Sequence, residues 1–204
     1  DAYAFLDKDA PDTANPSLWR NAQLNHIYSL FEVTDGIYQV RGYDIANITF
    51  VRSEHGWIVM DCGSSRYTAE EALKLFRSEM GDARIVAIVI SHAHVDHYGG
   101  VRGVVDEDDV KSGKVKVYAP AGFMQEAVSE NIMAGNAMSR RASYMYGNLL
   151  KPNAKGQVGA GLGTTTSAGT VTLIPPTDYI THTGQEEVID GLTYDFMMAP
   201  GSEA

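Results

Sequence analysis

The sequence predicts an α/β (α+β) fold in which sheets are flanked by helices, an αββα-type sandwich. Short β-rich runs joined by turn residues occupy the early and the late parts of the chain. Between them lie segments with helical spacing and one nearly continuous apolar run, residues 83–91. A run of that kind is typical of a strand that is buried on both faces of its sheet. We therefore expect other layers to pack on both sides of this strand.

The predicted boundary between two parts of the chain lies where the composition changes from mostly polar residues to β-forming residues. Residues 1–28 are expected to form an extended N-terminal arm that wraps the surface. Residues 29–204 are expected to form one domain, since a chain of this length can bury a substantial core. The first two β-rich runs of the domain meet at Asp35-Gly36, a dipeptide that favours a tight hairpin turn.

The middle of the chain contains the helical segments. Thr68 is expected to open a helix, because Glu71 follows three residues later as in a capping box, and Gly81 is expected to end it. A second helical region, broken near Gly135, is predicted over residues 121–150. Further strands are predicted over residues 114–120, 170–176, 178–184, 186–190 and 192–200.

Composition limits the possible partners. The formal net charge is −10, and no cluster of Lys and Arg resembles the footprint of a phosphate backbone, which argues against nucleic-acid binding. No apolar stretch approaches the roughly 20 residues that span a bilayer. The chain begins with Asp rather than Met, and we expect an exported protein, periplasmic or secreted, of a bacterium. A cytoplasmic location stays open as the alternative.

Four potential metal ligands lie within six residues directly after the predicted buried strand. His92, His94, Asp96 and His97 are all of types that a borderline cation such as Zn²⁺ accepts. His92 and His94 are two residues apart and can point the same way at the end of a strand. Asp96 and His97 follow on the turn. The spacing therefore suits two neighbouring metal ions, which lie about 3.5–4 Å apart in such sites.

The arrangement H-x-H-x-D-H resembles the signature of the metallo-β-lactamase superfamily. Asp61, in "VMDCG", matches an aspartate that the family carries at the end of the strand before the helix, and we expect it to orient a ligand. The "PGH" turn of many members is replaced here by "PGSE", with Ser202 at the histidine position and Glu203 after it. This departure is similar to the zinc-dependent alkyl sulfatases. The same similarity extends to "NPSLWRNAQLN", "GIYQVRGYDIANITFV", "NAMSRRASYMYG" and "GLGTTTS".

The resemblance implies a ligand set and a substrate. It makes His92, His94 and Glu203 ligands of one zinc ion and Asp96 and His97 ligands of a second, so that a complete site holds two Zn²⁺. It implies hydrolysis of alkyl sulfate esters, such as dodecyl sulfate, to the alcohol and inorganic sulfate through a metal-activated water. Asp96 is the residue expected to help orient that water. The resemblance also implies a homodimer formed through a region beyond this sequence, and a catalytic domain that is incomplete at its C-terminal side.

The Gly-rich segment after residue 152 has two interpretations. Thr164, Thr165 and Thr166 offer hydroxyl and backbone donors that suit an anion such as sulfate. The alternative is a flexible surface loop. Two other functions also stay open for the whole chain: a lactonase or thioesterase of the same fold, and a metal-binding segment without activity of its own.

Overall fold

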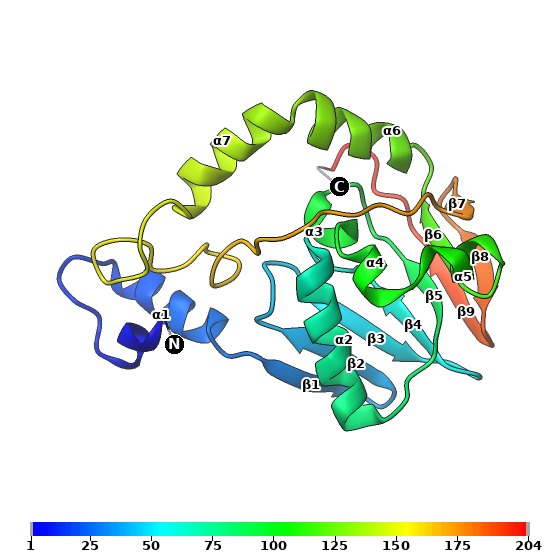
Figure 1. Cartoon of the computed structure of the whole chain (residues 1–204), viewed down its shortest axis with the longest axis horizontal. Helices are drawn as coiled ribbons and strands as arrows, with labels where there is room; N and C mark the ends of the chain where they lie inside the picture. Colours follow the sequence, from blue (N-terminus) through cyan, green and yellow to red (C-terminus); the bar gives the residue numbers. More distant parts are fainter. Residues whose placement is uncertain (1, 203–204) are drawn as a thin grey trace.

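The computed structural model describes residues 2–202, which contain a central sheet of seven strands ordered as they occur along the chain (Figure 1). The strands are β1 (Ser29–Thr34), β2 (Ile37–Arg41), β3 (Ile48–Arg52), β4 (Trp57–Met60), β5 (Ile85–Val89), β6 (Lys116–Pro120) and β7 (Asp178–Ile180). Neighbours from β1 to β4 are antiparallel, and neighbours from β4 to β7 are parallel. The hairpin turn predicted at Asp35-Gly36 is confirmed, because Thr34 pairs with Ile37 and Gly36 has a φ of 75°.

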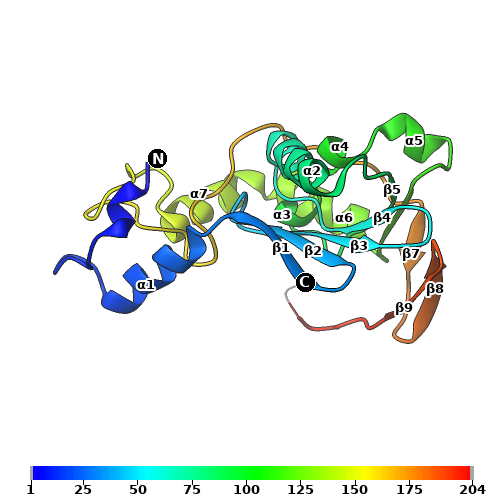
Figure 2. The ribbon, with the colours of Figure 1, turned by 90° about the horizontal axis from the view of Figure 1, so that it is seen from below.

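Different layers lie on the two faces of this sheet. The helical elements are η1 (Ala4–Asp7), α1 (Pro16–Asn25), α2 (Arg66–Met80), α3 (Val95–Tyr98), α4 (Val101–Val104), α5 (Glu107–Lys111), α6 (Phe123–Val128), the π-helical turn η2 (Ser129–Met133) and α7 (Gly135–Tyr146). Figure 2 shows α2, α4 and α5 on one face. A two-stranded hairpin, β8 (Gln185–Ile189) and β9 (Leu192–Phe196), lies on the other.

Both faces of the central strands are buried by these layers. On the helical side, the ring of Phe76 from α2 stacks on Phe50 from β3, with centroids 3.8 Å apart, and both side chains are fully buried. On the other side, Ile189 from β8 packs in a second cluster with Ile58 from β4. Strand β5 contributes residues to both clusters, which confirms the interpretation of residues 83–91 as a strand covered on two sides. The predicted mixed fold, with a central sheet between layers, is likewise confirmed.

The start of α2 differs from the prediction. The N-cap is Ser65 rather than Thr68, and the Ser65 hydroxyl accepts a hydrogen bond from the Thr68 backbone N–H at 3.3 Å. The capping-box interpretation of Thr68 and Glu71 was therefore wrong, because the Ser65 hydroxyl and Thr68 Oγ1 also bond each other at 2.9 Å inside the first turn. The predicted end is confirmed: Gly81 has a φ of 78° and donates its N–H to the Arg77 carbonyl.

The N-terminal segment is not the extended arm that was predicted for residues 1–28. It forms η1 and α1, and Asn15 caps α1 by accepting a hydrogen bond from the Ser17 N–H at 2.9 Å. The physical reason is a small core of its own, in which Trp19 and Leu6 are buried together with Val158 from a much later loop. None of the helices in residues 2–202 combines the length and the apolar character that crossing a membrane requires.

The later segments are partly as predicted. The helical region after β6 breaks at Ala134, next to Gly135, as expected, and α7 runs from there towards the N-terminal helices (Figure 1). The strand predicted for residues 170–176 is absent from the structure described. Proline at 175 and 176 supplies no N–H for a ladder, and Thr172 instead donates both its N–H and its hydroxyl to the Gly99 carbonyl, each at 2.7 Å.

Candidate metal centre

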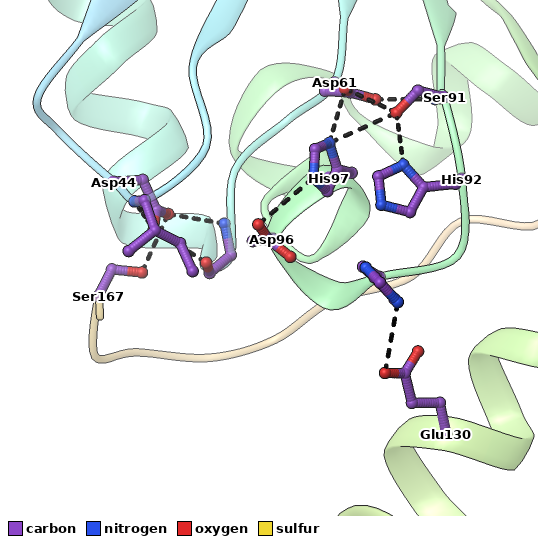
Figure 3. A network of polar contacts seen from close by, with 11 residues as sticks. Asp44, Asp61, Ser91, His92, Asp96, His97, Glu130 and Ser167 are labelled. Atoms are coloured by element: carbon purple, nitrogen blue, oxygen red, sulfur yellow. Dashed lines mark hydrogen bonds and ion pairs between the residues drawn. The ribbon is translucent and has the colours of Figure 1, made fainter. Parts of the chain in front are cut away.

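The predicted ligands lie together on the turn that connects β5 to α3. Strand β5 ends at Val89, so His92 and His94 sit on this turn rather than on the strand, and His94 is the N-cap of α3. The ring centroids of His92 and His94 are 4.6 Å apart, and those of His92 and His97 are 4.0 Å apart. Asp96 and His97 lie within α3 itself. Three imidazoles and a carboxylate therefore occupy one small region (Figure 3).

A neighbouring turn holds this ligand turn in place through the backbone. Cys62 donates its N–H to the His97 carbonyl at 2.7 Å, and Gly100 donates its N–H to the Gly63 carbonyl at 2.9 Å. A Cβ atom at Gly100 would lie 2.1 Å from the Cys62 carbonyl oxygen, which no side chain can accept. Glycine is thus required at this position by the close approach of two backbones, since the φ of Gly100 is an ordinary −90°.

Asp61 connects the two turns through its carboxylate. Its backbone has a φ of 59°, which is uncommon for a residue other than glycine. One carboxylate oxygen accepts the Ser91 N–H at 2.8 Å, and the other accepts the Ser91 hydroxyl at 2.8 Å and lies 2.7 Å from His97 Nδ1. The hydroxyl of Ser91 also lies 2.9 Å from His92 Nδ1. Asp61 and Ser91 together therefore determine the orientation of two imidazole rings.

The protonation of His97 follows from these contacts. Burial by itself lowers the pKa of His97, but hydrogen bonds to Asp61 and to Asp96 outweigh burial and raise this pKa to about 10. The pKa of Asp96 is affected first by burial, which raises it, yet the hydrogen bond from His97 makes the net shift downward. Burial and then the neighbouring imidazoles lower the pKa of His92. A metal ion bound through His97 Nε2 would therefore displace a proton from that nitrogen.

The chemistry of these donors suits a divalent cation. Imidazole and carboxylate ligands are those that Zn²⁺ prefers, and ligand histidines usually have their other nitrogen held by a carboxylate or a similar acceptor. His97 shows that arrangement with Asp61. Within residues 2–202, however, no three His, Cys, Asp or Glu side chains are arranged so that they could hold one ion together. The predicted ligand Glu203 lies outside the described residues.

Two of the three threonines proposed for anion binding line a pocket apart from the ligand turn. Thr164 and Thr165 line a pocket of about 330 Å³ together with Tyr28 and Tyr43. The Thr164 hydroxyl donates to the Asn25 carbonyl at 3.1 Å, and the Thr166 hydroxyl accepts from the Asn148 side chain at 3.2 Å. These contacts tie the loop to the last residue of α1 and to the segment that follows α7. The role of the loop in binding sulfate stays a prediction.

Three polar residues near the centre were not singled out from the sequence. Ser91 could have been found from the sequence, since it lies between the predicted buried strand and the cluster of ligand types. Asp44 is buried, accepts four hydrogen bonds and lines the pocket just described. Glu130, from η2, lies 3.7 Å from His94 Nε2. Neither of these carboxylates lies near the cluster in sequence, so only the folded structure shows that they are close to it.

Comparison with known proteins identifies the family of the chain. The family model described as the metallo-beta-lactamase superfamily matches residues 41–201. A linear primary-alkylsulfatase of Pseudomonas sp. is 65% identical over 99% of this chain and 30% of its own length. An alkyl/aryl-sulfatase of Saccharomyces cerevisiae is 50% identical over 100% of this chain and 32% of its own length.

A solved structure of similar sequence supports the same placement. The stereoselective inverting sec-alkylsulfatase of Pseudomonas sp. superimposes with a TM-score of 0.95 and 49% identity, over 100% of this chain and 32% of that one. The chain thus spans about a third of the length of the relatives it matches. The family match covers most of the chain, including every ligand candidate that the structure describes. The chain belongs to the metallo-β-lactamase superfamily.

Proposed function

We propose that the protein hydrolyses sulfate esters of linear primary alcohols, such as dodecyl sulfate, to the alcohol and inorganic sulfate. The observation that carries this proposal is the 65% identity, over nearly the whole chain, to a linear primary-alkylsulfatase. The solved sec-alkylsulfatase is also similar, at 49% identity, so secondary alkyl sulfates are the competing substrates in the test below.

Membership of the superfamily implies bound metal ions, and we propose two Zn²⁺. His92 and His94 would hold one ion, with Glu203 as a further ligand by resemblance, and Asp96 and His97 would hold the other. When bound, such a pair lowers the pKa of water towards about 7 and withdraws electron density from the oxygens of the ester. This chemistry suits a sulfate ester, which is anionic and resists attack by hydroxide.

The side chains of the site have distinct roles in this proposal. Asp61 holds the Nδ1 proton of His97, so that only Nε2 of that ring is available to a ligand. Ser91 does the same for His92 through its hydroxyl. Asp96 has a lowered pKa and is therefore ionised at neutral pH, so one of its oxygens can accept a hydrogen bond from the attacking water. The chain thereby orients both the ligands and the nucleophile.

The test is release of inorganic sulfate by the purified, zinc-supplemented protein. Dodecyl sulfate and a secondary alkyl sulfate are compared, and His94→Ala should lose both bound zinc and at least 100-fold in hydrolysis. His182→Ala is the matched control, because His182 is exposed on the loop before β8 and should behave like the unmodified protein. Full zinc content and full rate in His94→Ala would show that the site assignment is wrong.

The alternative functions are separated by the same preparation. Faster hydrolysis of a lactone or a thioester than of any alkyl sulfate would favour a different hydrolase of this fold. Zinc binding without hydrolysis of any of these esters would favour a metal-binding role alone.

A further inference from the structure

Another cavity, of about 380 Å³, lies at the end of the sheet away from the ligand turn. It is found where α5 and the β8–β9 hairpin lie on opposite faces at the same end of the sheet (Figures 1 and 2). Arg84 lines the cavity and directly precedes β5, whereas the ligand turn follows β5, and a strand of five residues is about 16 Å long. The side chains that line it include four that carry or can carry a positive charge: His55, Arg84, Lys114 and Lys116.

Arg84 brings a positive charge to this cavity without a carboxylate to balance it. Its side chain is exposed and makes no hydrogen bond or ion pair with any of residues 2–202. The pKa of His55 is raised, first by its hydrogen bond to Asp190, and the charge of Arg84 opposes that rise. The pKa of Lys114 is raised, first by its hydrogen bond to Asp109, and the charge of Arg84 again opposes the rise. The guanidinium therefore lies close to the other cations of the cavity.

The two lysines keep hydrogen-bond donors for a ligand. Lys114 Nζ lies 2.8 Å from Asp109 Oδ1, and Lys116 Nζ lies 3.2 Å from Asp178 Oδ1. Neither aspartate lines the cavity. An ammonium has three donors, so each lysine has more than its one aspartate occupies. Lys116 Nζ also lies 5.6 Å from the centre of the Tyr118 ring, which is part of the same wall.

Free acceptors are scarce among the described residues of this cavity. Its one carboxylate, Asp190, accepts the Ser53 hydroxyl at 2.6 Å and the His55 N–H at 2.7 Å through one oxygen. The other oxygen lies 2.8 Å from His55 Nδ1. Much of the remaining wall is apolar and comes from Val86, Ala87, Val188 and Ile189. A cavity with spare charged donors and an occupied acceptor suits an anion.

We propose that this cavity binds a tetrahedral oxyanion of the sulfate type, with Arg84 and Lys114 as its principal contacts. A guanidinium presents parallel N–H groups to such an anion, and an ammonium adds a point charge. Free sulfate and the headgroup of an alkyl sulfate offer the same chemistry, and an alkyl chain would then contact Val188 and Ile189. In a chain with a net charge of −10, this group of cations is a local exception. The inference does not depend on the proposed hydrolysis.

Titration of the zinc-supplemented, ¹⁵N-labelled protein with sodium sulfate at constant ionic strength tests the proposal. The backbone amide signals of Arg84 and of residues 113–116 should shift and saturate, whereas sodium chloride should have no such effect. Arg84→Gln should weaken the binding about 10-fold or more, because it removes a charged donor. Arg20→Gln is the matched control, since Arg20 is exposed on α1 and its loss changes the charge equally. Equal sulfate affinities of the two variants, or no saturable shift at these amides, would overturn the proposal.

Lys114→Gln gives an independent check from a different segment of the chain. It should also weaken sulfate binding, and it decides the question if Arg84→Gln proves to be less stable than the control. Unchanged affinity in Lys114→Gln would contradict the assigned contacts. Sulfate bound at the ligand turn would instead shift signals of residues 92–97 and would be insensitive to either substitution.

Octanesulfonate, which contains no ester bond to hydrolyse, distinguishes the two sources of the anion. Below its micelle concentration, tighter binding than that of sulfate, with a shift at Val188 and with loss in Arg84→Gln, would assign the cavity to alkyl sulfates. Equal affinities of octanesulfonate and sulfate would assign it to the free anion. No measurement in this series uses a sulfate ester, so failure of the proposed hydrolysis would be seen separately.

Discussion

Replacement of Asp44 should destabilise the wall of the pocket that Thr164 and Thr165 line. Asp44 lies between β2 and β3, is 6% exposed, and lines the pocket beside the threonine loop. One of its oxygens accepts from the Ser64 N–H at 2.7 Å and the Ser167 hydroxyl at 3.0 Å. The other accepts from the Ile45 N–H at 2.8 Å and the Ser64 hydroxyl at 2.9 Å. A single buried carboxylate therefore joins three separate segments of the chain.

The magnitude follows from the donors that would be left behind. Asp44→Ala removes the acceptor of two backbone N–H groups, each of which costs about 1–3 kcal/mol when buried without a partner. The hydroxyls of Ser64 and Ser167 can turn towards other acceptors and add less. Burial raises the pKa of Asp44, so the folded protein also bears a cost for the ionised carboxylate that the variant avoids. We expect a net loss of about 2–4 kcal/mol in the free energy of unfolding.

Asp44→Asn should be intermediate, for a reason visible in the contacts. Each carboxylate oxygen accepts one backbone N–H, so an amide in either orientation places its NH₂ against one of them and leaves one donor unpaired instead of two. We expect about half of the loss seen for Asp44→Ala.

Urea unfolding followed by circular dichroism measures both losses, with exposed Asp82→Ala as the control of equal charge change. At about 2–4 °C per kcal/mol, the melting temperature of Asp44→Ala should fall by about 5–15 °C. A stability of Asp44→Ala equal to that of Asp82→Ala would refute the reasoning.

Three further perturbations have defined outcomes. The pKa of His55 is raised above 6.5, first by its hydrogen bond to Asp190, so the contribution of this pair to stability is full below pH 6.5 and is lost as the pH rises through the raised pKa. Backbone amides of β8 and β9 should therefore exchange faster at pH 9 than at pH 6 after correction for intrinsic exchange rates. Equal protection at the two pH values would contradict this prediction. Phe76→Ala should lower the free energy of unfolding by about 3–5 kcal/mol, because it removes the ring that stacks on Phe50 and leaves a cavity in the core. A loss below about 1 kcal/mol would mean that neighbouring side chains repack into the cavity. Gly100→Ala should lower the free energy of unfolding by about 1–3 kcal/mol or more and weaken zinc binding, because the new Cβ would meet the Cys62 carbonyl oxygen. An unchanged zinc affinity in a chelator competition would show that the turn can shift to accommodate the methyl group.

Local patterns in the chain were sufficient for much of the fold. The apolar run at residues 83–91 predicts a strand covered on both faces, because its neighbours on both sides must be apolar. Asp35-Gly36 and Gly81 predict a turn and a helix end, since each depends on the backbone freedom of one glycine. The ligand types in residues 92–97 lie next to one another in sequence, and they remain neighbours in the folded protein.

Local sequence patterns gave wrong predictions where two residues can play the same role or where distant segments contact each other. Ser65 and Thr68 are both good N-caps, and in the structure it is the Ser65 hydroxyl that accepts a backbone N–H of the first turn, that of Thr68. The arm appeared polar and therefore extended, yet Trp19 found partners in a loop more than a hundred residues later. Gly100 permits the backbone of another turn to approach, and no pattern next to it in the sequence indicates that contact.

Four of the candidate metal ligands could thus be proposed from one short stretch, because ligand chemistry belongs to the residue type and their spacing is local. The way each ring is held could not. Asp61 meets His97 from 36 positions away, and Glu130 meets His94 from a different helix. Such contacts depend on how the layers and turns pack against each other, which no periodicity along the chain encodes, and only the folded protein shows which oxygen faces each ring.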